Sequence, residues 1–345
     1  MHSKRLLCVL ILFCTITTTI FAQNKIQLKI ASIAPSRSPW DIELRLLAQK
    51  WSKITGGQVQ VTFYDTNSLG GEKSVIQKLR SVRPGQKAPL DGAIFTTIGL
   101  HELSPLASVY TLSLPFLIQN QKELDSVLDT LGSKLTKPMK EAGFELIAWT
   151  NVGWLSFYTK DPFSNLDELK KIKIASAGLD SPILGDTFRT IGLTIEDIHG
   201  SKLLQALKSN GGVRGFFGVH MFAYVTGLSK TIHYALDTKL SPVMAGFLLS
   251  NEAWEQIPEQ HKVSMMKAVQ EMKVRLNAAL EETELSYMNK MTQEGVIAIR
   301  PTAAQTNQWK ADFAREFILV TKTVPGVFNI ELYNDIRKLL ESGKK

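Results

Sequence analysis

Side chains that could catalyse a reaction or bind a metal are present, but not at the spacings that such sites require. The six histidines stand apart from one another: His2, His101, His199, His220, His233 and His261. The sequence has no His-x-x-His or Cys-x-x-Cys pair, no Gly-x-Ser-x-Gly elbow and no P-loop. The Gly-rich stretch 211–215 follows a predicted helix, whereas a phosphate site precedes one. We therefore expect no metal, no cofactor and no enzymatic activity.

Aromatic side chains offer a different chemistry, the binding of apolar molecules. Trp154 and Phe157 lie in one predicted strand, and Phe216 and Phe217 lie in another. If they face one cleft, a ligand gains about 0.8 kcal/mol for each CH₂ group that it buries there. The alternative is that these side chains form the core, as most aromatic residues do. Because successive strand residues point to opposite faces, we expect one of Phe216 and Phe217 in the core and the other at the cleft.

Three arginines could instead hold an anionic ligand: Arg37, Arg189 and Arg214. A guanidinium group binds a carboxylate through two parallel, charge-assisted hydrogen bonds, which give both strength and orientation. Arg214 is the preferred candidate of the three, because we expect its turn to lie on the hinge side of a two-lobe protein.

Alternating strands and helices must position these residues. Strand-like patterns occur at 26–33, 59–64, 90–95, 144–151 and 246–251. Helical spacing of apolar residues occurs at 40–53 and 72–82. It also covers 254–294, interrupted by Pro258, which is long for a globular helix and too irregular in its heptads to favour a coiled coil. This alternation predicts parallel, βαβ-type sheets.

Length and composition indicate a globular protein of about two domains. The chain has 345 residues, of which 44% are hydrophobic and 21% charged. Its formal net charge of +8 falls to +6 without Lys4 and Arg5. A mild positive balance of this kind does not predict nucleic-acid binding, although it favours an anionic membrane surface or an acidic partner.

The N-terminus has the pattern of a secretory signal peptide. Lys4 and Arg5 precede an uncharged run from 6 to 20, and Ala22 offers a small residue before a polar start. A transmembrane anchor is the alternative, but the run is shorter than the roughly 20 residues of a span. Both cysteines, Cys8 and Cys14, lie in this segment, and Cys14 is a weak candidate for lipid attachment. We expect export to the periplasm and a mature chain without disulfides.

A series of short motifs occurs in the order found in a known family. The N-terminal ones are Ala34-Pro35, Pro39-Trp40, Thr55-Gly56-Gly57, Leu69-Gly70-Gly71-Glu72, Asp91-Gly92-Ala93 and Leu114-Pro115-Phe116-Leu117. The stretches 169–178, 188–193 and 205–215 follow. Together, over roughly 230 residues, they resemble the DctP family, the extracytoplasmic solute receptors (P subunits) of TRAP transporters. The resemblance fades after Pro258.

The polar residues of that family pattern are changed in this chain. The two arginines with which a usual member binds a carboxylate fall on Leu155 and Ala175. The family's "VVDGQEN" falls on Arg214 and, after it, on Phe216 and Phe217. A buried, unpaired carboxylate is costly, so the altered pattern favours a hydrophobic or amphipathic ligand such as a lipid-like acid. It also resembles spirochaete-type P subunits, which pair with a tetratricopeptide-repeat lipoprotein.

The resemblance implies an α/β periplasmic-binding-protein fold, with two lobes, crossing strands and one long helix spanning both. The implied divisions are a signal peptide at 1–22, lobe I at 23–150 completed by about 236–255, lobe II at 151–235, and the spanning and C-terminal helices at 256–345. The candidate ligand-binding residues are Trp40, Glu72, Thr97, Trp154, Leu155, Ala175, Ser201, Arg214, Phe216 and Phe217.

The implied function is that of a receptor that hands a small molecule to the TRAP membrane subunits. Two alternatives stay open. One is a receptor for a polar organic acid that uses a relocated cation such as Arg214. The other is a periplasmic lipid chaperone or scaffold without a transport role.

Overall fold

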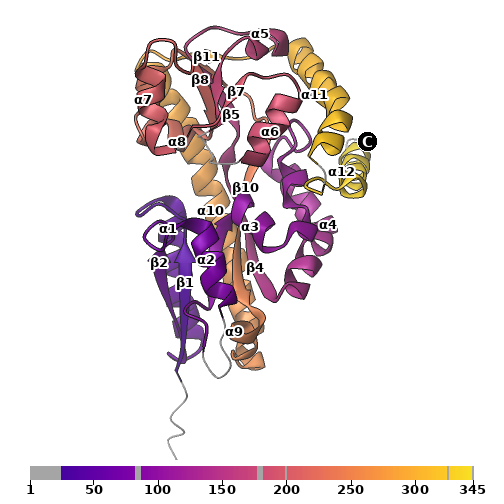
Figure 1. Ribbon diagram of the computed structural model, residues 1–345. Coiled ribbons are helices and arrows are strands. Elements are labelled where there is room, and N and C mark those ends of the chain that lie inside the picture. Colours follow the sequence, from indigo (N-terminus) through magenta and orange to yellow (C-terminus); the bar gives the residue numbers. More distant parts are fainter. Residues whose placement is uncertain (1–24, 82–86, 177–181, 199, 325, 344–345) are drawn as a thin grey trace, which may run out of the picture.

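The computed structural model describes residues 25–81, 87–176, 182–198, 200–324 and 326–343. The predicted signal peptide and His199 lie outside these residues. The described chain forms two lobes, one above the other in Figure 1, joined by strands and by a long helix at one side.

Lobe I is built on a five-stranded sheet in the order β2-β1-β3-β10-β4. Its strands are β1 (Ile26–Ser32), β2 (Val59–Asp65), β3 (Gly92–Thr96), β4 (Phe144–Trp154) and β10 (Pro242–Ser250). Strand β1 pairs in parallel with β2 and β3, whereas β10 is antiparallel to β3 and β4. Its helices are α1 (Pro39–Ile54), α2 (Gly71–Arg80), α3 (Thr97–Leu103), α4 (Gln121–Glu141) and α9 (Asn251–Glu255), with the 3₁₀ turns η1 (Pro105–Ala107) and η2 (Val109–Ser113).

Lobe II is built on a six-stranded sheet in the order β11-β9-β5-β8-β6-β7. Its strands are β5 (Ser156–Thr159), β6 (Ile174–Ala175), β7 (Ile195–Glu196), β8 (Gly215–Gly218), β9 (Tyr234–Leu236) and β11 (Ile297–Ile299). Its helices are α5 (Leu166–Lys170), α6 (Pro182–Thr190), α7 (Leu203–Lys208) and α8 (His220–Val225), with the 3₁₀ turns η4 (Gly200–Lys202) and η5 (Leu228–Thr231). The C-terminal helices α11 (Ala303–Thr323) and α12 (Ile330–Ser342) pack on α6 and α4 respectively, and so touch both lobes.

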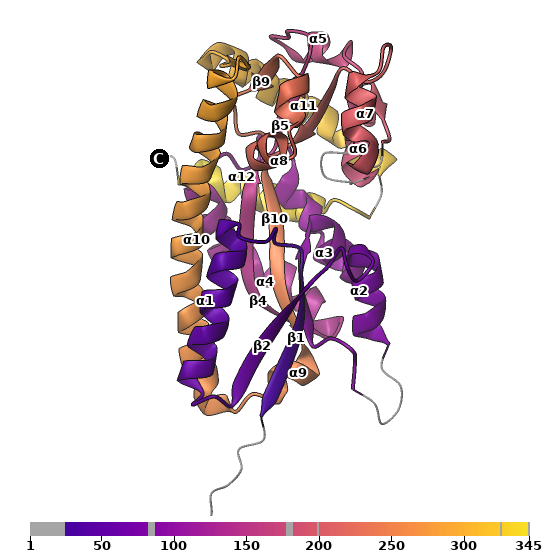
Figure 2. The ribbon, with the colours of Figure 1, turned by 90° about the vertical axis from the view of Figure 1, so that its left-hand side faces the viewer.

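Three of the described segments lead from one sheet to the other. Strand β4 runs into β5 with only Leu155 between them, and residues 237–241 lead from β9 back to β10. Helix α10 (Glu259–Gln293) packs on α1 and β4 in lobe I and on α8 and β11 in lobe II. Figure 2 shows it running along both lobes. The predicted crossing strands and long helix are thus present, and Pro258 stands at the N-cap of α10, where the sequence pattern is interrupted.

The lobe boundaries differ slightly from those expected. The change of sheet falls at Leu155 instead of between residues 150 and 151, because Trp154 still pairs with Pro242 of β10. The return crossing starts after Leu236, because β9 still pairs with β5 and β11 in the sheet of lobe II. Residues 297–299, expected among the C-terminal helices, form β11 and extend this second sheet.

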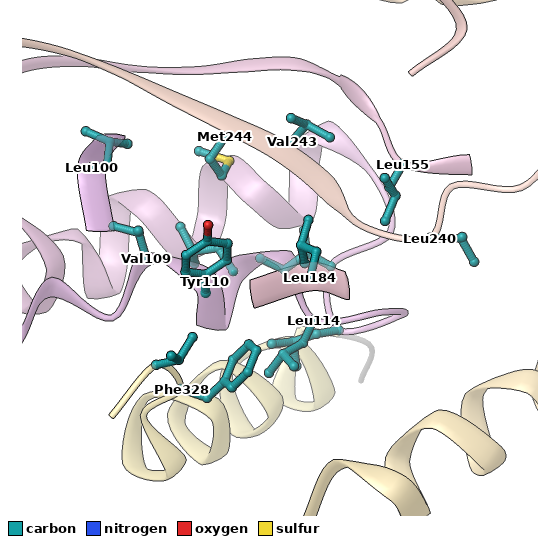
Figure 3. Packing of buried hydrophobic residues seen from close by; sticks show 14 of the residues in the cluster. Leu100, Val109, Tyr110, Leu114, Leu155, Leu184, Leu240, Val243, Met244 and Phe328 are labelled. Carbon is teal, nitrogen blue, oxygen red and sulfur yellow. The ribbon is translucent and has the colours of Figure 1, made fainter. Parts of the chain in front are cut away.

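Apolar packing ties α10 and the hinge to both lobes. Met265, Val269, Met272 and Leu276 of α10 are buried in the core of lobe I, and Met288 and Met291 in that of lobe II. A further apolar cluster runs from lobe I through the hinge into lobe II, and Figure 3 shows Leu155, Leu184 and Val243 in it. Because Leu155, Leu184 and Val243 are buried in one cluster, the hinge is part of the hydrophobic core. Each fully buried aliphatic side chain stabilises the fold by about 1.5–3 kcal/mol.

Candidate functional site

A cavity of about 550 Å³ lies between the lobes; we call it the interlobe cavity. Lobe I contributes the residues after β1 and β2, the start of α2 and the β3–α3 junction. Lobe II contributes Gly200, Leu204, Phe222, Thr226 and Leu228. Ligand sites in proteins are typically clefts of about 300–1,000 Å³, so this cavity has the size for a small molecule.

Glu72, one of the residues predicted to bind the ligand, lines the interlobe cavity. It lies in the first turn of α2 and accepts hydrogen bonds from the backbone N–H of Thr96 (2.6 Å) and from its hydroxyl (2.8 Å). Burial raises the pKa of Glu72, and the hydrogen bonds from Thr96 oppose that rise. A Cβ at Gly99 would lie 2.8 Å from the carboxyl oxygen, so glycine at this position leaves room for it. Glu72 is therefore held rigidly by the β3–α3 junction.

Thr97 and Leu155 line a smaller space of about 30 Å³ at the hinge, which we call the inner cavity. It borders the interlobe cavity, since Thr96 and Ile98 line both. Leu155, Leu184 and Val243 make much of its wall apolar. Thr97 donates its hydroxyl proton to the carbonyl of Met244 (3.1 Å). A volume of this size holds about two waters, so a larger group enters only if the hinge region opens.

The expectation that one of Phe216 and Phe217 faces the cleft is wrong. Both side chains are fully buried. Phe217 packs edge-on against Phe157 and Phe188, with ring centroids 6.2 and 5.0 Å away, and Phe216 stacks on Tyr158 at 4.8 Å. Strand β8 lies inside a sheet that is covered on both faces, so the alternation places the two phenylalanines in two different core clusters.

Ala175 also lies in the core of lobe II, where a cleft-facing side chain was expected. It is fully buried and belongs to the apolar cluster that contains Tyr158 and Phe216. Strand β6 lies between β8 and β7, and both of its residues are fully buried. Of the two positions at which the family pattern has arginine, only Leu155 reaches a cavity between the lobes.

Three further candidates lie outside the interlobe and inner cavities. Trp40 is buried in the core of lobe I, with no hydrogen-bond partner for its indole N–H. Trp154 lines a separate cavity behind the hinge, with the ammonium of Lys239 5.1 Å from its ring centre. Ser201 is exposed in η4, next to Gly200 of the interlobe cavity.

Arg214 lies at the end of lobe II far from the hinge, which corrects its predicted place. Gly218 pairs with Ser156 beside the crossing, whereas Gly215 pairs with Thr159 at the outer end of β5. Arg214 follows that outer end and forms a two-pronged ion pair with Asp161, with its Nε 2.6 Å from Oδ2. Of the other two candidates, Arg189 is paired with Asp186 and Asp197.

We expect Arg214→Ala to have a small effect. The Arg214 and Asp161 side chains are 47% and 41% exposed, and exposed ion pairs contribute about 0–1 kcal/mol. Urea unfolding should therefore show a loss of less than about 1 kcal/mol, and the affinity for a bound solute should stay unchanged. Loss of solute binding in a stable Arg214→Ala protein would restore Arg214 as the relocated cation.

A buried polar cluster that sequence reasoning missed lies behind the hinge. Glu284 of α10, His220 of α8 and Trp154 line a cavity of about 280 Å³, which we call the hinge cavity. A glutamate in a helix usually indicates a solvent-facing position. In this helix the spacing indicates burial instead, because Glu284 stands four residues from Leu280 and from Met288, on the apolar ridge of the helix.

In the described part of the chain, the His, Cys, Asp and Glu side chains form no group of three or more that could hold a metal ion. None of the helices in the same residues combines the length and apolar character that a membrane crossing requires.

Comparison with known proteins gives consistent matches. Residues 30–317 match the family described as bacterial extracellular solute-binding protein, family 7 (DctP). An uncharacterized protein of Haemophilus influenzae is 22% identical over 257 residues, covering 73% of this chain and 74% of that protein.

Solved structures share the fold. A TRAP periplasmic solute-binding protein of Chromohalobacter salexigens with bound D-glucuronate gives a TM-score of 0.76 at 18% identity, over 90% of this chain and 99% of that one. Another from Ochrobactrum anthropi, with its C-terminus in the ligand-binding pocket, gives 0.80 at 17% identity, over 93% and 97%. The predicted two-lobe α/β fold is confirmed. Since the family match spans most of the sequence, this chain belongs to the DctP family of bacterial extracellular solute-binding proteins, which are receptors and not enzymes.

Proposed function

We propose that this protein is the periplasmic receptor of a TRAP-type secondary transporter. It captures a small molecule in the interlobe cavity and delivers it to the TRAP membrane subunits, without catalysing a reaction. The observation that carries the proposal is the 550 Å³ cavity between two lobes that are joined by three crossing segments, since such an arrangement allows closure around a ligand by hinge motion. Residues 1–22 direct export, and the mature chain starts near Gln23.

The proposed ligand is hydrophobic or amphipathic, such as a lipid-like acid. Its hydrocarbon part lies toward Leu155, Leu184 and Val243 of the inner cavity, which widens to admit it. Its polar end lies toward Lys73, the cation among the described residues that line the interlobe cavity. Burying an unpaired carboxylate beside Leu155 is costly, so the orientation with the polar end at Lys73 is favoured.

A polar organic acid is the second candidate, because a structurally similar relative was solved with D-glucuronate. In this chain its cation is Lys73, since Arg214 lies at the far end of lobe II. The resemblance to spirochaete-type P subunits extends the proposal to a tetratricopeptide-repeat lipoprotein partner, which co-purification with that lipoprotein would test.

The ligand class is tested by native mass spectrometry of the purified protein, followed by titration of stripped protein with decanoate and with D-glucuronate. We expect a hydrocarbon-containing compound to co-purify and decanoate to bind more tightly. Leu155→Arg should weaken decanoate binding by about tenfold or more, because a charge replaces apolar contact in a desolvated space.

Two variants sharpen this test. Leu155→Met keeps the side-chain volume and should change decanoate affinity by less than about threefold. Lys73→Ala separates the candidates, because it removes the proposed cation while leaving the inner cavity intact. Tighter binding of D-glucuronate than of decanoate, lost in Lys73→Ala, would overturn the apolar ligand and favour the polar one.

A further inference from the structure

The hinge cavity lies where all three crossing segments meet. Trp154 and Ser156 come from the first crossing, residues 237–239 from the second, and Glu284 from α10, while His220 of α8 closes the lobe II side. A group in this cavity therefore touches each of these three connections between the two sheets.

Glu284 packs directly on the backbone of the first crossing. The backbone N–H of Trp154 faces this carboxyl group and acts to lower its pKa. A Cβ at Gly153 would lie 2.6 Å from its Oε1, and Gly153 has a φ of 140°. Glycine is thus the residue that both the backbone and the carboxyl group allow here. Glu284 ties the long helix to the point where β4 leaves lobe I.

His220 and Tyr158 form the other wall of this cluster. The His220 Nδ1 and the Tyr158 hydroxyl are 2.5 Å apart, and Tyr158 is fully buried. The His220 Nε2 lies 3.9 Å from the Glu284 Oε2, and the two side chains are only 10% and 14% exposed. Burial lowers the pKa of His220 to about 4. At neutral pH the pair is therefore not an ion pair, despite its short separation.

The remaining charged groups of the cavity would leave a negative charge on Glu284 largely uncompensated. Arg300 donates to Asp237 at 2.8 Å, and Lys239 lies over the Trp154 ring. Glu281, three residues before Glu284 on α10, is exposed. Burial raises the pKa of Glu284 to about 8, and the Trp154 N–H and Lys239 oppose that rise without reversing it.

We propose that Glu284 is a proton-sensitive latch of the hinge. In its protonated form it fits against the Gly153–Trp154 backbone without placing an uncompensated charge there. Loss of the proton places a charge in a buried space and favours a hinge geometry in which the carboxylate is hydrated. This inference concerns the lobes themselves and holds whatever solute the protein carries.

Proton linkage sets how far the ratio of the two hinge geometries can change with pH. The hinge geometry described here binds the Glu284 proton with a pKa of about 8, against an ordinary 4.5 in water. If the alternative geometry restores the ordinary value, the ratio of the two geometries changes by at most about 30-fold between pH 6.5 and 9. Such a change is large enough to see in a distance distribution.

Spin labels on the two lobes test the latch. Lys53→Cys on α1 and Lys208→Cys on α7 place labels at exposed positions of lobe I and lobe II, and both native cysteines lie before the proposed mature start near Gln23. Double electron–electron resonance should show the interlobe distance distribution of the solute-free protein changing between pH 6.5 and 9, with a midpoint near 8. Glu284→Gln, which stays neutral, should keep the pH 6.5 distribution throughout.

Glu282→Gln is the matched control, because Glu282 is exposed on the same helix and does not line the hinge cavity, so the pH response should stay intact. Glu284→Met is a second neutral variant if Glu284→Gln fails to fold. A wild-type distribution that does not change between pH 6.5 and 9 overturns the latch. So does an equal change in the wild type and in a neutral Glu284 variant.

Discussion

The free energy of unfolding should stay level between about pH 4.5 and 6.5 as Glu284 and His220 titrate, and then fall toward pH 8. The folded pKa of Glu284, about 8, lies above its ordinary 4.5, so the folded state binds the extra proton in that window and stability falls as pH rises. The folded pKa of His220, about 4, lies below its ordinary 6.5, so there the unfolded state binds the extra proton and stability rises with pH. The two slopes cancel where the windows overlap.

The expected loss between pH 6.5 and 8 is about 2 kcal/mol, since one proton changes stability by about 1.4 kcal/mol per pH unit. Glu284→Gln should remove this fall and leave only the rise up to pH 6.5. His220→Asn, which keeps a polar atom near the Nδ1 position, should remove the rise. Its stability should then fall by roughly 4–5 kcal/mol from pH 4.5 to 8.

Urea unfolding at several pH values, followed by the fluorescence of the six tryptophans, measures these profiles. Subtracting each variant from the wild type removes the titration of all other groups. Parallel profiles for wild type and Glu284→Gln would mean that Glu284 titrates as an ordinary surface carboxyl group.

Ala175→Arg should cost the protein several kcal/mol of stability without creating a carboxylate site. Ala175 is fully buried within the cluster of Tyr158 and Phe216. The longer side chain overpacks this core and brings a guanidinium group into it, so the loss should reach about 3–5 kcal/mol. Thermal unfolding should show a large drop in the midpoint, and D-glucuronate should not restore it.

Ala175→Met separates the two causes of this loss, because it adds volume without charge and should cost about 1–3 kcal/mol. The difference between the Arg and Met variants measures the burial of the charge. An Ala175→Arg protein with an unchanged midpoint, or one that gains affinity for D-glucuronate, would show that position 175 faces the ligand after all.

The large features of the fold could be predicted from the sequence because they leave long patterns. A helical spacing from 254 to 294 and strand patterns at 144–151 and 246–251 were enough to predict a spanning helix and crossing strands. The interior of lobe II was harder. A strand covered on both faces has the same sequence pattern as one that borders an apolar cleft, so the sequence did not distinguish these environments for Ala175, Phe216 and Phe217.

The candidate site could be predicted from the sequence only in part, for similar reasons. Glu72, Thr97 and Leu155 lie at the lobe boundary. Their positions could be predicted because the order of the surrounding elements matches the family pattern. Arg214 was misplaced because its position depends on the pairing of β8 with β5, which no local pattern specifies. Glu284 was missed because a charged residue on an apolar helix ridge is outweighed by the usual exposure of glutamate.

The position of β10 has a consequence for how the chain reaches its native state. Residues 242–250 insert between β3 and β4, which precede them by most of lobe II. A chain that emerges N-terminus first therefore carries β3 and β4 with open hydrogen-bonding edges until β10 arrives. Open edges of this kind template pairing between molecules. Lobe I thus has a high contact order, and the edges of β3 and β4 stay open to pairing between molecules until β10 is in place.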